Sequence, residues 1–220
     1  MRFRDKFIEK LKYSNFLRLV FDGIAKFGLR ITPYYVVREG IWGTGMPSLE
    51  QPLKGYTLRF LVENDTDALG QLRNGQYPEG QLAQRLNKGH LCLGLVHAGR
   101  IVAFNWANPH EFSGNLCRFD LEPDEAYLYD AYTIPDYRGK RLAPYLRYQT
   151  YRCLSRRGMN RIYSISDAFN TPSIRFKQKL KARFVKLGLS IQLLNRRTYN
   201  ITLRQLPDFK NRLQASVQEE

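Results

Sequence analysis

Alternation between apolar and polar positions divides the chain into predicted strands and helices. A period of two with many aromatic and β-branched residues marks strands, and apolar residues three and four apart mark helices. Strands are predicted over residues 34–37, 56–62, 91–97, 101–108, 126–134, 161–166, 184–194 and 197–203. Helices are predicted over 65–72, 80–86, 142–154 and 171–180, and a polar, turn-rich loop over 112–124. One sheet with flanking helices accounts for this order and indicates an α/β fold class.

The first 30 residues form a basic amphipathic segment. Apolar residues recur at helical spacing from Phe7 to Phe27, and eight basic residues against three acidic ones give a net charge of +5. Such a helix can lie on an anionic membrane surface, dock on an acidic partner or pack against its own domain. The predicted organisation is a helical extension with a short strand and linker, a main domain and a polar tail, over residues 1–55, 56–203 and 204–220.

A basic turn follows the strand that ends at Ile134. The first N–H groups of a helix lack partners and its N-terminus is electropositive, so a phosphate group is stabilised there. Arg138, Lys140 and Arg141 add charge to the turn, and Gly139 lets a ligand approach the backbone closely. The turn predicts a phosphate site; the alternative is an ordinary basic turn before a surface helix.

A second strand, loop and helix follow about thirty residues after the first. Asn170 or Thr171 can cap this helix, and Pro172 fits its first turn because proline lacks the N–H that is unpaired there anyway. Ser173 lies in the same turn. Capping alone explains Asn170 and Ser173, and it is also compatible with a ligand-binding role.

Together, these two segments resemble the acyl-CoA-binding motifs of the GNAT superfamily of N-acetyltransferases. The family's Arg/Gln-x-x-Gly-x-Gly/Ala pattern falls on Arg138, Arg141 and Ala143, with Arg141 in place of the middle Gly. Its Asn-x-x-Ser pattern falls on Asn170 and Ser173 at the spacing the family requires. Two motifs in this order are more specific than either one alone.

The resemblance covers residues 56–203 and implies the GNAT fold, a central mixed, mostly antiparallel twisted sheet flanked by helices. It also implies an acyltransferase that takes acetyl-CoA as acyl donor. The basic, tyrosine-rich N-terminal region is similar to that of acetyltransferases in bacterial polysaccharide assembly, a similarity that identifies no substrate. The cofactor-binding residues implied by the resemblance are Tyr132, Thr133, Arg138, Gly139, Lys140, Arg141, Leu142, Ala143, Asn170 and Ser173.

Acyl transfer to an amine also needs a proton acceptor and a proton donor. By the resemblance, Asp130 is the carboxylate nearest the expected thioester position and the candidate general base, with Glu125 and Asp136 at the ends of its strand. The family's Tyr, which protonates the CoA thiolate, is replaced by Lys177. Lys177 is therefore the candidate general acid, and Tyr132 or solvent are the alternatives.

The chain of 220 residues carries a net charge of +15 with 43% hydrophobic residues. Residues 138–197 contain sixteen Lys or Arg and one acid, Asp167, so this segment alone carries +15. Such a field favours capture of a phosphorylated cofactor and leaves an acidic carrier protein or an anionic membrane as candidate partners. Nucleic acid is disfavoured because no nucleic-acid-binding motif is recognisable.

Three cysteines and three histidines lack any metal-ligand spacing, so no metal site is predicted. The odd number of cysteines suggests reduced thiols and a cytoplasmic protein, with peripheral membrane contact through the basic helix as an option. No secretory signal or membrane span is expected, since Arg18, Asp22 and Lys26 interrupt the apolar stretch over residues 16–27.

Three functions are compatible with these features. The first is an N-acetyltransferase that moves the acetyl group of acetyl-CoA directly to a primary amine in a ternary complex, the acceptor being an amino sugar or another small amine. The second is an acyltransferase that uses a longer acyl-CoA or an acyl carrier protein. The third is a non-catalytic CoA- or RNA-binding module, for which the missing Tyr is the main argument.

Overall fold

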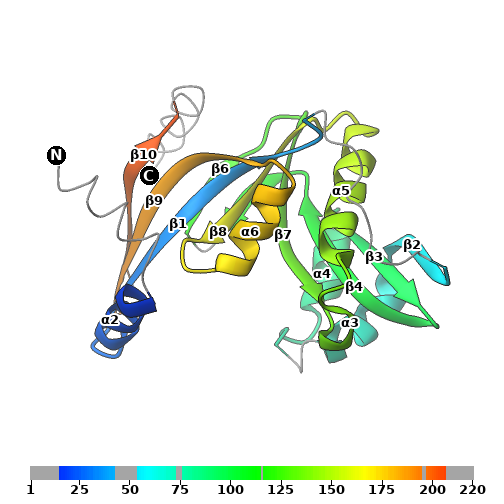
Figure 1. Ribbon diagram of the computed structural model, residues 1–220, viewed down its shortest axis with the longest axis horizontal. Coiled ribbons are helices and arrows are strands. Elements are labelled where there is room, and N and C mark those ends of the chain that lie inside the picture. Colours follow the sequence, from blue (N-terminus) through cyan, green and yellow to red (C-terminus); the bar gives the residue numbers. More distant parts are fainter. Residues whose placement is uncertain (1–14, 43–53, 73–75, 115, 195–196, 207–220) are drawn as a thin grey trace.

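An eight-stranded mixed sheet runs through the described molecule (Figure 1). The computed structural model describes residues 15–42, 54–72, 76–114, 116–194 and 197–206. The strands lie in the order β10 (Arg197–Gln205), β9 (Arg183–Leu193), β1 (Leu29–Glu39), β8 (Arg161–Asp167), β7 (Glu125–Thr133), β4 (Arg100–Asn108), β3 (Leu91–His97) and β2 (Tyr56–Leu61). β7 and β8 pair in parallel, and the other neighbours pair antiparallel. The predicted mixed, mostly antiparallel sheet is confirmed.

Helices cover both faces of the half of the sheet that contains β2, β3, β4 and β7. The helices are α2 (Asn15–Ala25), α3 (Thr66–Leu72), α4 (Gln81–Asn87), α5 (Leu142–Ser155) and α6 (Thr171–Lys179), with 3₁₀ turns η1 (Glu63–Asp65) and η2 (Pro135–Tyr137). Leu93 of β3 packs in one core cluster with Leu146 of α5, whereas its neighbour Cys92 packs with Leu69 of α3 and Leu82 of α4. Adjacent strand residues point to opposite faces, so α5 lies on one face and α3 and α4 lie on the other.

β1 is longer and more central than the sequence predicts. The expected short strand of the extension, over 34–37, is an eleven-residue strand between β8 and β9. This part of the extension therefore belongs to the main sheet. Pro33 argues against a strand in the sequence, because proline has no N–H to donate to a neighbouring strand. It is tolerated in β1 because pairing with β8 begins only at Tyr34, opposite Asp167.

The segment predicted as a loop over 112–124 contains a short hairpin. Its strands, β5 (Glu111–Gly114) and β6 (Cys117–Asp120), form a separate two-stranded sheet. Phe112 is fully buried, and its ring centroid lies 4.3 Å from that of Tyr127 on β7. Strands of only four residues give too short an alternation to be recognised in the sequence. The hairpin is therefore evident only from the structure, where Phe112 packs against Tyr127.

The N-terminal helix α2 lies near the end of the molecule that is distant from α5 (Figure 1). It confirms part of the predicted amphipathic segment, and Phe21 contacts the ring of Phe169 edge-on at 6.0 Å. The rest of that prediction, over 1–14, and most of the predicted tail, over 207–220, lie outside the described residues. None of the helices that the structure describes has the length and apolar character needed to cross a bilayer.

The parallel strands β7 and β8 separate part-way along their length. Their pairing begins at Glu125 and ends where Leu128 lies opposite Ser164. Beyond that point β7 carries a bulge, because its pairing with β4 shifts register and Asp130 adopts a positive φ of 47°. The bulge bends β7, and the unpaired part of its edge lines an open cleft.

Candidate active site

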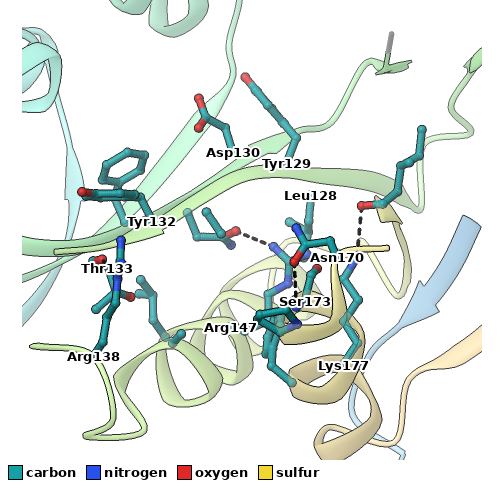
Figure 2. A pocket seen from close by; sticks show the side chains of 18 residues that line it. Leu128, Tyr129, Asp130, Tyr132, Thr133, Arg138, Arg147, Asn170, Ser173 and Lys177 are labelled. Atoms are coloured by element: carbon teal, nitrogen blue, oxygen red, sulfur yellow. Dashed lines mark hydrogen bonds between the residues drawn. The ribbon is translucent and has the colours of Figure 1, made fainter. Parts of the chain in front are cut away.

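The cleft beside β7 has a volume of about 630 Å³ and is lined by β4, β7, α5 and α6. Figure 2 shows that Asp130 and Tyr129 lie on one side of β7, whereas Arg147, Ser173 and Lys177 lie on the other. The cleft is lined by eight of the twelve residues that the sequence predicted for the site: Asp130, Tyr132, Thr133, Arg138, Ala143, Asn170, Ser173 and Lys177.

A smaller cavity of about 290 Å³ continues from the cleft around the start of α5. Arg141 precedes the helix in the left-handed conformation, with φ 59°, and its side chain forms no capping hydrogen bond. The first N–H groups of α5 therefore receive no side-chain cap from this residue, and they are available to an anion. Arg138, Arg175 and Lys179 also line this cavity, so cations from the basic turn and from α6 surround the helix start.

Arg138 joins the two cavities. Its Nε donates a hydrogen bond to the Thr133 carbonyl at 3.1 Å, and its guanidinium lies 5.7 Å from the centre of the Tyr132 ring.

Among the predicted cofactor-binding residues, Lys140 lines neither of the two cavities. Its ammonium packs 4.6 Å from the centre of the Tyr137 ring, so the basic turn spreads its cations over two directions.

These features fit the pyrophosphate of CoA. The helix N-terminus without a side-chain cap, the open space around Gly139 and the convergent cations meet the demands of a ligand with several phosphate charges. Leu142 and Ala143 lie at the first helical positions of α5, where backbone groups face such a ligand.

On the opposite wall of the cleft, Asn170 caps α6. Its Oδ1 accepts a hydrogen bond from the Ser173 backbone N–H at 3.2 Å, as the sequence predicts. The Ser173 hydroxyl lies 3.0 Å from that of Ser166 on β8. Asn170, the cap of α6, and Ser173, in the first turn of α6, thus also line the cleft.

The backbone of β7 offers polar groups to the cleft. The Ile134 N–H donates to the Val102 carbonyl on the side of β4. Because backbone groups alternate in direction along a strand, those of Thr133 point to the opposite side, where β8 has already separated. A ligand lying along this edge can therefore bind like an added strand.

The Asp130 side chain is bound by residues on the face of the sheet that α3 and α4 cover. Its carboxylate accepts hydrogen bonds from Arg85 Nη1 at 2.6 Å and from the Tyr77 hydroxyl at 2.9 Å. The Arg85 guanidinium lies 5.1–5.3 Å from the ring centres of Tyr77, Trp106 and Tyr129. The bulge and this cation–aromatic cluster fix the carboxylate at the rim of the cleft.

A buried charge cluster supports the other side of the cleft. Glu39 on β1 is fully buried and accepts two hydrogen bonds from Arg147 of α5, at 2.8 and 2.9 Å. Tyr151 and Ser164 also donate to this carboxylate, and Lys177 Nζ lies 3.6 Å from it. Two cations therefore face one carboxylate, and all three groups are buried.

Burial and pairing oppose each other in this cluster. Burial alone would raise the pKa of Glu39, but Arg147 and Lys177 outweigh it and hold the pKa at about 2. Burial lowers the pKa of Lys177 to about 8; attraction to Glu39 opposes this effect and repulsion by Arg147 adds to it. Lys177 is therefore mainly charged at neutral pH and titrates just above it.

Sequence reasoning missed Glu39, Arg147 and Arg85. Glu39 ends a strand that the sequence placed outside the main domain, and Arg147 is one of many cations in a basic run. Neither has a local signal, because their hydrogen bond joins residues 108 positions apart in the chain.

The comparisons with known proteins agree with this geometry. The model of the acetyltransferase (GNAT) family matches residues 58–181, more than half of the chain. The chain belongs to the GNAT acetyltransferase family. Its enzymatic class is therefore that of the GNAT acetyltransferases. No curated protein matches the chain significantly.

Two solved structures share the GNAT fold at low sequence identity. A GNAT-family protein from Novosphingobium aromaticivorans is 21% identical, with a TM-score of 0.51 over 76% of this chain and 66% of its own. An N-acetyltransferase from Sphaerobacter thermophilus is 17% identical, with a TM-score of 0.53 over 86% of this chain and 56% of its own. The chain thus spans between about half and two thirds of the length of these two proteins.

Proposed function

We propose that this GNAT protein transfers the acetyl group of acetyl-CoA directly to a primary amine of a small molecule, such as an amino sugar, in a ternary complex. The observation that carries the proposal is the continuity of the two cavities, which share Thr133, Arg138, Ala143, Pro172 and Phe176. One extended ligand can therefore place its pyrophosphate at the start of α5 and its thioester beside β7.

In the proposed reaction, Asp130 collects the proton that an ammonium must lose before it attacks the thioester. Arg85 and Tyr77 orient its carboxylate at the rim of the cleft. The backbone N–H of Thr133 stabilises the developing oxyanion, an interaction typically worth about 3–4 kcal/mol. Lys177 supplies the proton for the leaving thiolate, in the place of the family's Tyr.

The proposal extends to partners and location. The acceptor is a small amine, and the protein acts in the cytoplasm without a metal ion. The basic surface of α5 and α6 also suits an acidic carrier protein that delivers a longer acyl group, and the basic segment over residues 1–30 suits peripheral contact with an anionic membrane. A non-catalytic CoA- or RNA-binding module is the remaining alternative.

Calorimetric titration with acetyl-CoA tests the first step, and absence of binding would sink the proposal. Release of free thiol is then measured with glucosamine, an aminoglycoside and a polyamine as acceptors. Binding without thiol release indicates a non-catalytic module, and release only from a long-chain acyl-CoA or acyl carrier protein indicates the second function. Binding of RNA or anionic vesicles at low salt tests the remaining partners.

A further inference from the structure

A chain of two serine hydroxyls leads from the buried Lys177 ammonium to the wall of the cleft. Lys177 Nζ lies 2.6 Å from Ser166 Oγ, and Ser166 Oγ lies 3.0 Å from Ser173 Oγ. Lys177 lines the cleft but is only 2% exposed, Ser166 is 4% exposed and does not line the cleft, and Ser173 lines it. The three groups thus form a continuous path from a buried cation to the ligand site.

The ammonium has no proton left for a direct contact with the ligand. An ammonium carries three N–H groups. Lys177 Nζ has three acceptors within hydrogen-bond distance: Ser164 Oγ at 2.6 Å, Ser166 Oγ at 2.6 Å and the Ile165 carbonyl at 3.2 Å. Direct protonation of a thiolate would break one of these bonds, whereas transfer through Ser166 uses a bond that is already formed.

The direction of the hydrogen bonds suits transfer toward the cleft. Ser166 Oγ must accept from Lys177, because an ammonium only donates. The Ser166 proton is then free to be donated to Ser173, and the Ser173 hydroxyl keeps its own proton for a group in the cleft. With Ser166 as the donor to Ser173, every donor along the path points away from Lys177 and toward the ligand.

We propose that Ser166 and Ser173 relay a proton from Lys177 to the thiolate of CoA, a proposal that rests on the proposed acetyl transfer. As the C–S bond breaks, the thiolate takes the Ser173 hydroxyl proton and becomes the thiol. Ser173 takes the proton of Ser166, and Ser166 takes one from Lys177, which becomes a neutral amine. The proton that Asp130 collects from the acceptor passes on to solvent, and Lys177 takes up a proton from solvent to regain its charge.

The surroundings of Lys177 suit a reversible donor. The charged groups that face it are Glu39 from β1 and Arg147 from α5, and Tyr151 of α5 donates a hydrogen bond to the same Glu39 carboxylate. β8 contributes the hydroxyls of Ser164 and Ser166. With a pKa of about 8, Lys177 is charged at neutral pH and releases its proton more readily than an ordinary lysine.

The test compares Ser166→Ala with Ser164→Ala. Each variant removes a hydroxyl 2.6 Å from Lys177 Nζ, but only Ser166 leads to Ser173. The kcat and KM of thiol release from acetyl-CoA are measured against pH with the best of the three named amines, or with water as acceptor. The wild type is expected to lose kcat as pH rises through about 8, because Lys177 loses its proton.

Ser166→Ala is expected to lower kcat about 100-fold with little change in KM for acetyl-CoA and to abolish this dependence on pH. Ser164→Ala should keep the pH dependence, and Ser166→Thr, which restores a hydroxyl, should recover most of kcat. The double variant Ser166→Ala with Lys177→Met should have nearly the same kcat as Ser166→Ala alone, because both changes interrupt the same relay.

Equal effects of Ser166→Ala and Ser164→Ala, or a retained pH dependence in Ser166→Ala, would overturn the relay while leaving acetyl transfer intact. Absence of thiol release by the wild type, with amine or water, would overturn both proposals.

Discussion

The two ends of the cleft hold their cations in opposite ways. At the proposed phosphate end, around the start of α5, Arg138 and Arg141 are exposed on one continuous turn and line the smaller cavity. At the thioester end, Arg147 and Lys177 are buried and share Glu39, which comes from a distant strand. Exposed cations cost little stability and act on the ligand, whereas buried cations depend on a counter-ion and first have to be stabilised by the fold.

The largest expected effect concerns that counter-ion. Glu39→Gln keeps the shape of the side chain but leaves two buried cations without a carboxylate, so the free energy of unfolding should fall by about 3–5 kcal/mol. Urea denaturation measures the change. Asp22→Asn is the matched control, since its pair with Arg18 is exposed, and it should change stability by less than about 1 kcal/mol. Similar losses of unfolding free energy in both variants would contradict a larger role of Glu39 in stability than that of an exposed ion pair.

The next effect is a dependence of stability on pH. Burial lowers the pKa of Lys177 from 10.5 to about 8, so between these values the unfolded chain binds more protons than the folded one. The free energy of unfolding should therefore rise with pH across this window, by up to about 3 kcal/mol from this residue. Lys177→Met should remove that rise in denaturation curves measured across this window. The same slope in the wild type and in Lys177→Met would show that folding does not lower the pKa of Lys177.

At the phosphate end, Arg138→Ala should weaken ligand binding and leave stability nearly unchanged. A charge-assisted hydrogen bond to a phosphate is worth about 1.5–3 kcal/mol, so the Kd for acetyl-CoA should rise about 10- to 100-fold. Calorimetric titration measures the shift. Arg156→Ala, which removes an exposed cation at the opposite end of α5, should leave the Kd unchanged. An equal rise in the Kd for acetyl-CoA in both variants would show that the overall positive charge of the protein, and not a specific contact of Arg138, determines the affinity.

The smallest effect concerns the backbone of the same turn. Arg141 stands in the left-handed region at φ 59°, which costs a residue with a Cβ about 1 kcal/mol relative to glycine. Arg141→Gly should therefore raise the free energy of unfolding by about this amount while weakening acetyl-CoA binding a fewfold. Arg141→Ala is the control: it removes the same charge but keeps the strain. A similar stability for the two variants would contradict the role of the backbone.

Much of the fold follows from local patterns. The alternation in β2, β3, β4, β7 and β8 and the helical spacing in α3, α4, α5 and α6 predict elements that the structure confirms. β1 and the β5–β6 hairpin were not predicted as the structure has them. The pairing of β1 with β8 and β9 joins residues more than 120 positions apart, which no local pattern encodes.

By itself, the sequence determined the family of this protein and predicted the phosphate site at the start of α5. The prediction of this site rests on residues that are close together in the chain, from Arg138 to Ala143, and on the cap at Asn170. The spacing of these residues was therefore enough to make the prediction. Only the tertiary structure decided the thioester end. Glu39 and Lys177 meet there because the fold inserts β1 beside β8, and burial then sets their charges and their hydrogen bonds.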